Sequence, residues 1–305
     1  MNINTTAVPP FFSIIIPTFN RAHLIVETLN SVLQQSFTDF EVIVVDDCSK
    51  DFDELQNKIL QLSDPRLSLI RHEQNKNGAA SRNTGIKRAN GEYICFLDSD
   101  DTWPLNRLEL VRTNIMNLLS TPMLIFYGQV DFKYPHQSVG EIKPQKPIEN
   151  QRVADYLFLH DGLIQTSTIV CKREIAQNVM FDERFRRHQD YDFCLRAEKL
   201  GYKFYFIESV LSNWLRYPEV STFAKGATYD RCKFWLDEME GYLGSCAINA
   251  YRAKILAPIA LESGRVLTGI SLCVRNIWSL PVNQIFPAMI KCAKGLAKLF
   301  LRLLK

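Results

Sequence analysis

Three carboxylates stand close together in FLDSDDTW, residues 96–103. Asp98, Asp100 and Asp101 end the segment GEYICFLDSDD, whose composition is typical of a buried strand that ends in acid. Adjacent carboxylates repel one another unless a cation or hydrogen-bond donors compensate them. Oxygen ligands at this density suit Mg²⁺ or Mn²⁺, ions that one or two carboxylates commonly hold together with substrate phosphates. The stretch therefore predicts a metal and a phosphorylated ligand, with Ser99 facing away from Asp98 and Asp100.

Two further polar segments follow apolar runs that read as strands. PTFNR (17–21) comes after FFSIII, and the pair of aspartates in DDCS (46–49) ends EVIVVDD. In open α/β sheets, ligands bind outside the carboxyl ends of the strands, so one crevice could collect all three polar segments. Each has a structural alternative, because PTFNR is also a common turn, DDCS can cap a helix, and Asp101 can cap the turn that follows it.

The elements that must position these segments follow a βαβ pattern. Continuous apolar strands separated by helical patterns indicate a parallel sheet that is covered on both faces. Strands are expected at 11–16, 41–47, 66–72 and 91–101, with helices at 23–34 and 78–90.

The pattern continues beyond the acidic stretch. Helices are expected at 104–120, 152–160 and 190–201, strands at 122–132, 165–175 and 202–208, and a loop or hairpin at 133–151. Gly201 is a suitable helix stop. From about residue 227 the pattern is helical, which predicts two domains, 1–225 and 226–305.

Charge is distributed unevenly along the 305 residues. Residues 241–305 hold nine Lys or Arg against Glu262 alone, a net +8, so the remaining 240 residues carry −5 of the total of +3. A mildly acidic body is thus joined to a basic end, which indicates two different partners. The apolar content of 47% is sufficient for a large core.

The chain carries no sequence signal for export. Eight scattered cysteines without a Cys-x-x-Cys pair predict reduced thiols in a cytoplasmic protein. The N-terminus lacks the basic region of a signal peptide, and no uncharged window is long enough to predict a membrane span.

Several ordered motifs resemble those of the family 2 nucleotide-sugar glycosyltransferases. They are FSIIIPTFNRAHLIVETLNSVLQQSFTDFEVIVVDDCSKD, NGAASRNTGI, GEYICFLDSDD and RRHQDYDFCLRAEKLGY, over about residues 11–220. The resemblance implies an α/β GT-A fold, a Rossmann-like mixed sheet flanked by helices, here with a C-terminal helical extension.

The resemblance also implies roles for individual residues. Asp100 matches the carboxylate that ligates Mn²⁺ or Mg²⁺ between the two phosphates. The nucleotide sugar would be bound by Pro17, Thr18, Phe19, Asn20, Arg21, Asp47, Arg82, Asp98, Ser99 and Arg216. The loop 133–168 belongs to the region where acceptor pockets form, with Gln165, Thr166 and Ser167 as polar candidates.

The catalytic base of the family usually lies in a Glu-Asp pair just before a helix. Here the pair reads Gln189-Asp190, so Asp190 is the expected base, and the substitution of the first acid removes a like charge beside it. The alternative is that Asp190 is only a helix N-cap. A metal-site histidine found in many relatives is absent from 213–222. His188 is a possible replacement, although it fits better as an exposed loop residue.

The implied function is an inverting, metal-dependent hexosyltransferase. The expected donor is a UDP-sugar, with glucose or galactose ahead of their N-acetylated forms, and the expected acceptor is a polyprenyl-diphosphate-linked saccharide in bacterial O-antigen or capsule biosynthesis. A single transfer is expected because the Gln-x-x-Arg-Trp motif of polymerising members is missing. The alternatives are a transferase acting on a protein or soluble glycan, or a catalytically silent nucleotide-sugar binding protein. A dehydrogenase is disfavoured because no G-x-G-x-x-G follows the first strand.

The C-terminus combines a basic stripe with aliphatic residues. Lys291, Lys294, Lys298, Arg302 and Lys305 share one side of a predicted helix within 281–305. This composition indicates a helix lying on an anionic membrane surface, which would place a cytoplasmic, peripheral enzyme at the inner face of the cell membrane. The alternative is a helix packed on the body with a solvated lysine face. Nucleic acid is a poorer partner because stacking aromatics are lacking.

Overall fold

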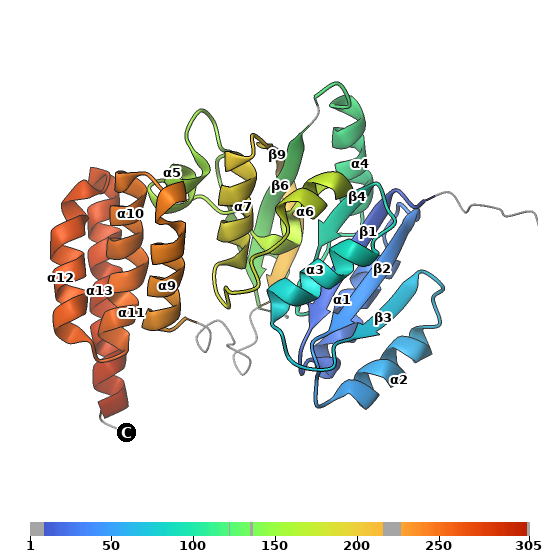
Figure 1. Ribbon diagram of the computed structural model, residues 1–305, viewed down its shortest axis with the longest axis horizontal. Coiled ribbons are helices and arrows are strands. Elements are labelled where there is room, and N and C mark those ends of the chain that lie inside the picture. Colours follow the sequence, from blue (N-terminus) through green and yellow to red (C-terminus); the bar gives the residue numbers. More distant parts are fainter. Residues whose placement is uncertain (1–8, 122, 135–136, 216–226, 304–305) are drawn as a thin grey trace, which may run out of the picture. The chain divides into compact units, whose positions relative to one another are not determined.

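The computed structural model describes residues 9–121, 123–134, 137–215 and 227–303. The chain forms two compact units (Figure 1). The sheet unit comprises residues 1–143, 164–183 and 201–216, and the helical unit comprises 144–163, 184–200 and 217–305. Each unit is therefore built from three separate segments of the chain. The boundary predicted near 225 lies outside the described residues.

The sheet unit contains a mixed sheet of nine strands among the described residues. Its parallel part runs in the order β3-β2-β1-β4, with β1 pairing with both β2 and β4. These strands are β1 (Phe12–Thr18), β2 (Phe40–Asp46), β3 (Leu67–Arg71) and β4 (Tyr93–Phe96). The parallel arrangement predicted for the first hundred residues is confirmed.

The sheet continues beyond β4 as β8-β6-β9-β5. Strand β8 is antiparallel to β4 and β6, β6 runs parallel to β9, and β7 completes a hairpin with β6. These strands are β5 (Asp101–Thr102), β6 (Leu124–Lys133), β7 (Glu141–Lys143), β8 (Val170–Lys172) and β9 (Lys203–Leu215). The strand predicted at 165–175 is wrong for most of its length, because a 3₁₀-helix η1 (Thr166–Thr168) precedes β8 and helix α6 (Arg173–Val179) follows it.

Helices cover both faces of the parallel strands. They are α1 (Ala22–Leu33), α2 (Phe52–Leu62), α3 (Gly78–Arg88) and α4 (Arg107–Asn117). Helix α2 was expected only under the alternative that DDCS caps a helix, and its N-cap is Asp51. Alternate residues of β1 point to opposite faces: Phe12, Ile14 and Ile16 join the core formed with α1, α2 and α4, whereas Ile15 meets α3. Figure 1 shows α3 and α6 lying over one face of the sheet. Burial on both faces explains the unbroken apolar runs at 14–16 of β1 and 42–45 of β2.

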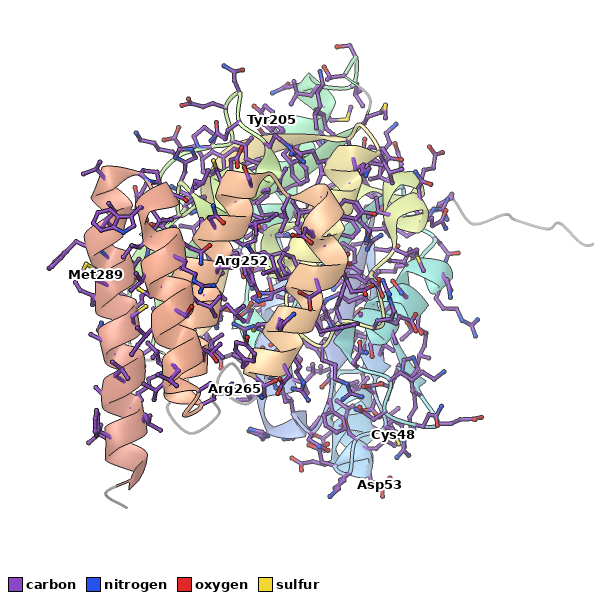
Figure 2. The ribbon with its side chains drawn as sticks, turned by 60° about the vertical axis from the view of Figure 1, so that its left-hand side comes forward. Cys48, Asp53, Tyr205, Arg252, Arg265 and Met289 are labelled. Carbon is purple, nitrogen blue, oxygen red and sulfur yellow. The ribbon has the colours of Figure 1, made fainter. Side chains whose placement is uncertain are left out.

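The helical unit is helical throughout its described C-terminal part, as predicted. Its elements are α5 (Val153–Phe158), α7 (Gln189–Lys199), α9 (Tyr229–Met239), η2 (Glu240–Tyr242), α10 (Ser245–Tyr251), the π-helix η3 (Arg252–Leu256), α11 (Ala257–Glu262), α12 (Val266–Asn276), η4 (Ile277–Ser279) and α13 (Val282–Leu303). Figure 2 shows them with Arg252 labelled on η3, Arg265 just before α12 and Met289 on α13. No helix in the described ranges has the length and apolar character needed to cross a bilayer. After α7, Gly201 has a φ of 89°, which fits its predicted role as a helix stop.

Helix α3 approaches β1 closely because Gly85 has no side chain. A β-carbon at this position would overlap the side chain of Ile15. We therefore expect Gly85→Ala to lower the free energy of unfolding by about 1–3 kcal/mol through overpacking. The measurement is urea unfolding followed by circular dichroism. Gly241→Ala is the matched control, since nothing lies within 4 Å of a β-carbon there. Equal unfolding midpoints for the two variants would contradict the close-packing interpretation.

Candidate functional site

The acidic stretch forms a turn just beyond β4. The strand ends at Phe96, and the amide of Asp101 donates a 3.1 Å hydrogen bond to the carbonyl of Asp98. The expectation of a strand reaching residue 101 is therefore wrong. Ser99 is buried, whereas Asp98 and Asp100 are partly exposed. We call residues 98–101 the acid turn.

Two arginines from different elements pair with the acid turn. Arg21, directly before α1, places Nη1 2.6 Å from Oδ1 of Asp100. Arg82 on α3 pairs through Nη2 with Oδ1 of Asp98. The fold thus brings together four residues predicted to act on the donor. Two carboxylates matched by two guanidinium groups make a cluster able to bind both a cation and an anion.

The carboxyl of Asp100 is held in an unfavourable electrostatic environment. Burial raises its pKa, the charge of Asp98 raises it further, and Arg21 opposes both effects. A bound divalent cation would favour the ionised carboxylate at this point. The described residues contain no cluster of three or more His, Cys, Asp or Glu able to hold a metal. Asp98 and Asp100 of the acid turn form a donor set that fits an ion held by one or two carboxylates, with phosphate oxygens completing its shell.

Asp101 serves to anchor the turn. Its Oδ2 accepts hydrogen bonds of 2.7 Å from both Nε2 of Gln165 and Oγ of Ser167. Burial and the charges of Asp100 and Asp98 raise the pKa of Asp101 well above its usual range, against the effect of these two donors. The observed partners of the Asp101 carboxylate are Gln165 and Ser167, so the alternative that Asp101 caps the next turn is wrong. Gln165, Thr166 and Ser167, the polar candidates for the acceptor pocket, are buried, and Gln165 and Ser167 hold the acid turn.

Ser167 connects the acid turn to the core. Its hydroxyl accepts the amide of Asp98 at 3.0 Å, and its carbonyl accepts Nε1 of Trp103 and Nη2 of Arg107, each at 3.1 Å. The guanidinium of Arg107 lies 3.4 Å from the ring centre of Trp103. Burial lowers the pKa of Arg107 to about 10. One residue in η1 therefore fixes the acid turn and its buried support, a role that sequence reasoning missed.

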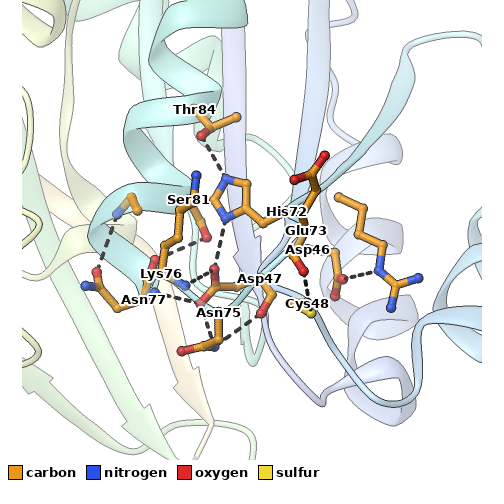
Figure 3. Close-up of polar contacts among 12 residues, drawn as sticks. Asp46, Asp47, Cys48, His72, Glu73, Asn75, Lys76, Asn77, Ser81 and Thr84 are labelled. Atoms are coloured by element: carbon orange, nitrogen blue, oxygen red, sulfur yellow. Dashed lines mark hydrogen bonds and ion pairs between the residues drawn. The ribbon is translucent and has the colours of Figure 1, made fainter.

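Asp47 organises the loop between β3 and α3 (Figure 3). Its Oδ1 accepts from the amide of Lys76 at 2.8 Å and lies 2.9 Å from Nδ1 of His72. Its Oδ2 accepts from Nδ2 of Asn75 and the amide of Asn77, each at 2.7 Å. Contact of Asp47 with a uracil ring stays a prediction. These four partners were missed, although the polar run HEQNKN directly follows a parallel strand, as the other site segments do.

The PTFNR segment ties the ends of β1 and β2 together. The amide of Asn20, whose φ is 53°, donates to Oγ of Ser49 at 2.8 Å, and its Oδ1 accepts the amide of Lys50 at 2.8 Å. The ring of Phe19 is 44% exposed, which leaves an aromatic surface for a ligand. Pro17 and Thr18 end β1 and are buried, and Oγ1 of Thr18 has no hydrogen-bond partner among the described residues.

Asp190 lies in the helical unit, whereas the acid turn lies in the sheet unit. Helix α7 begins at Gln189 with His188 as its N-cap, so Asp190 lies inside the first turn and the N-cap alternative is wrong. Its Oδ1 accepts the amide of Tyr191 at 2.9 Å. The role of Asp190 as a base stays a prediction, and Arg216 lies outside the described residues.

His188 is buried, which contradicts its interpretation as an exposed loop residue. Nε2 of the ring is 2.9 Å from the hydroxyl of Tyr251, and the ring stacks on Tyr191 at 4.9 Å. The ring of Trp235 lies edge-on at 5.1 Å. Burial, with the nearby charge of Arg187, lowers the pKa of His188 well below its usual range. The imidazole therefore holds the start of α7 as a neutral, packed group.

Comparisons with known proteins identify the family of this chain. A family model described as "Glycosyl transferase family 2" matches residues 13–179. The amylovoran biosynthesis glycosyltransferase AmsB of Erwinia amylovora is 40% identical over 247 residues, which cover 79% of this chain and 82% of AmsB. The UDP-Glc:alpha-D-GlcNAc-diphosphoundecaprenol beta-1,3-glucosyltransferase WfgD of Escherichia coli is 38% identical over 188 residues, 61% of this chain and 69% of WfgD.

Solved structures show the same GT-A-like architecture. S. aureus TarS 1–349 in complex with UDP is 20% identical, with a TM-score of 0.59 over 96% of this chain and 92% of TarS 1–349. The mannosyltransferase PcManGT from Pyrobaculum calidifontis, in complex with GDP-Man and Mn²⁺, is 18% identical, with a TM-score of 0.55 over 95% of this chain and 81% of its own. The predicted α/β fold with a helical C-terminal region is confirmed.

The raised pKa of Asp101 predicts a pH-dependent effect of Asp101→Asn. Between the unfolded pKa of about 4 and the higher folded pKa, the folded state binds more protons, so the contribution of Asp101 to stability falls as pH rises. Asparagine keeps an acceptor oxygen for Gln165 and Ser167 but carries no charge. We therefore expect the variant to gain stability relative to the parent chain as the pH is raised from about 4 to about 7.

Urea unfolding at several pH values measures this difference. Asp53→Asn on α2 is the control, because it removes the charge of an aspartate whose side chain is exposed. A stability difference for Asp101→Asn that did not change with pH would show that Asp101 is not the titrating group.

Proposed function

Because this chain belongs to the family 2 glycosyltransferases, we propose that it transfers a hexose, glucose or galactose, from a UDP-sugar to a saccharide on a polyprenyl diphosphate. The names of two relatives support this choice. AmsB is an amylovoran biosynthesis enzyme, and the name of WfgD specifies a UDP-glucose donor and a diphosphoundecaprenol-linked acceptor. The proposed pathway is bacterial surface-polysaccharide biosynthesis, O-antigen or capsule. The proposed location is peripheral, at the inner face of the cell membrane, where such an acceptor would lie.

The paired charges of the acid turn carry this proposal. Arg21–Asp100 and Arg82–Asp98 lie just beyond the carboxyl ends of β1 and β4, where α/β sheets bind ligands. A nucleoside diphosphate brings negative charge that the two guanidinium groups can pair with. The carboxylates released from these pairs can then face a divalent cation. Without ligand, the two arginines offset the electrostatic repulsion between the neighbouring carboxylates.

The residues fit Mn²⁺ or Mg²⁺ bound by Asp100, with Asp98 beside it. When bound, such an ion neutralises charge that develops on a departing diphosphate. Ser167, Gln165 and Asp101 contribute by fixing the turn, since a carboxylate must be held in place to act on phosphate oxygens. Phe19 offers an exposed ring for stacking against a nucleobase.

Asp190 supplies the general base in the proposed mechanism. The acceptor hydroxyl attacks the anomeric carbon from the face opposite the leaving UDP, its proton passes to the carboxylate of Asp190, and the bond from that carbon to the UDP oxygen breaks. One displacement of this kind inverts the anomeric centre. Asp190 lies in the first turn of α7, and the buried His188 holds the start of this helix. The carboxylate therefore has a rigid support.

The two carboxylates should fail in different ways. We expect Asp190→Asn to lower kcat by about 10²–10⁴ while UDP binding is retained, because only proton transfer is lost. Asp100→Asn should lower turnover and also weaken Mn²⁺-dependent UDP binding. Turnover is measured as UDP release with a panel of UDP-sugars, and binding by calorimetry. Asp53→Asn is the exposed control on α2. Turnover near that of the parent chain in either variant would remove that residue from the mechanism.

A further inference from the structure

Helix α12 carries an exposed apolar row. Its members are Leu267, Ile270, Val274 and, in η4, Trp278, with side-chain exposures of 86%, 46%, 58% and 78%. Spacings of three and four residues place them on one side of the helix. A different side of α12 packs on α11. At Gly269 on that side, a β-carbon would overlap the side chain of Leu261. The exposed row was not predicted, because α12 alone resembles an ordinary buried helix.

Helix α13 exposes a second apolar surface. Ala288 and Cys292 are buried, and a β-carbon on Gly295 would lie 2.6 Å from the carbonyl of Pro258, so this side packs closely on α11. The exposed apolar residues are Val282, Phe286, Met289, Ile290, Phe300 and Leu301. Figure 2 shows Met289 on the outer side of α13. Helices α12 and α13 therefore share α11 as their support and leave large apolar side chains uncovered.

Positive charge accompanies these exposed rows. Lys291, Lys294 and Lys298 are exposed along α13, and neither α12 nor α13 contains an acidic residue. Glu262, the single acid among residues 241–305, lies 3.1 Å from Lys298. An occupant of this surface must therefore accept apolar side chains and supply negative charge. We call the exposed rows of α12 and α13, together with these lysines, the basic apolar face.

We propose that the basic apolar face binds the surface of an anionic lipid bilayer. Its apolar side chains enter the boundary between headgroups and acyl chains, and its lysines meet lipid phosphates. A second copy of the chain fits poorly, because two such faces would bring like charges together. Since no described helix is suited to span a bilayer, both helices would lie in the interface. The proposed contact thus includes α12 as well as the terminal helix, and it does not depend on the identity of the donor sugar.

Trp278 provides a reporter at this surface. Of the four tryptophans, Trp103 and Trp235 are buried and Trp214 is partly buried, whereas Trp278 is 78% exposed. We expect a saturable blue shift of tryptophan fluorescence when the full chain meets vesicles containing phosphatidylglycerol. Vesicles of phosphatidylcholine alone should produce a much smaller change. Trp278→Phe should abolish the shift while the chain still co-sediments with the anionic vesicles.

Substitutions on α12 test the apolar contribution. We expect Leu267→Gln combined with Val274→Gln to lower the partition coefficient by about ten-fold or more. The matched control is Leu60→Gln with Leu119→Gln, which replaces two exposed leucines of the sheet unit, 65% and 57% exposed, and should bind as the parent does. Lys291→Gln and Lys294→Gln should each lower the partition coefficient for anionic vesicles about five-fold and make that coefficient less dependent on salt concentration.

Three outcomes would overturn the proposal. They are equal binding to neutral and anionic vesicles, unchanged binding of the α12 double variant, and a lipid-free dimer that this variant dissociates. The last result would identify the face as a subunit interface, and sedimentation velocity measures it. UDP binding is measured by calorimetry on the same samples. Lost membrane binding with intact UDP binding therefore separates this proposal from the proposed transferase activity.

Discussion

The acid turn depends on charge compensation supplied from three separate segments. Asp100 is paired with Arg21 before α1, Asp98 with Arg82 on α3, and Asp101 with the neutral donors Gln165 and Ser167 of the η1 region. Adjacent carboxylates at the end of a buried strand would otherwise repel one another strongly. The sheet order places β1, β4 and β8 side by side, so Arg21 beyond β1 and the Gln165–Ser167 segment before β8 lie next to the end of β4. Helix α3, which packs on β1, adds Arg82. The strand order that builds the sheet is thus also the order that the acid turn needs for its charge compensation.

The three acids are compensated in chemically different ways, and this difference assigns their roles. Guanidinium partners can transfer to phosphate oxygens when a ligand arrives, which frees Asp98 and Asp100 for a cation. Asp101 is buried and held by an amide and a hydroxyl, which have no reason to leave. In the proposed mechanism, Asp98 and Asp100 are therefore the part of the turn that exchanges partners, and Asp101 is the part that stays fixed. The short spacing of the acids in the sequence conceals this division.

Local patterns predicted much of the fold, because the strand and helix signals lie within a few residues of one another. The parallel strands, the polar ends of β1, β2 and β4, and the stop of α7 at Gly201 all follow from such signals. The functions of Ser167 and His188 do not. Ser167 acts through a carboxylate 66 residues away, and His188 meets Tyr251 63 residues away, so their burial depends on the completed fold. The 3₁₀-helix at 166–168 likewise follows from these contacts, since its β-branched composition alone favours a strand.

The two interpretations of the C-terminal helix, a packed support and a membrane surface, describe different sides of the same element. On its inner side Gln284 of α13 accepts a 2.9 Å hydrogen bond from the buried Lys254, which also donates to the carbonyl of Phe158 at the end of α5. The ring of Phe158 in turn meets Tyr191 of α7, next to the proposed base. Removing α13 would uncover Lys254 and the small core around Leu261 and Cys292, and it would disturb the support of α7. Deletion of the terminal helix would therefore affect membrane binding and catalysis together. Substitution of single side chains on its outer side changes membrane binding alone.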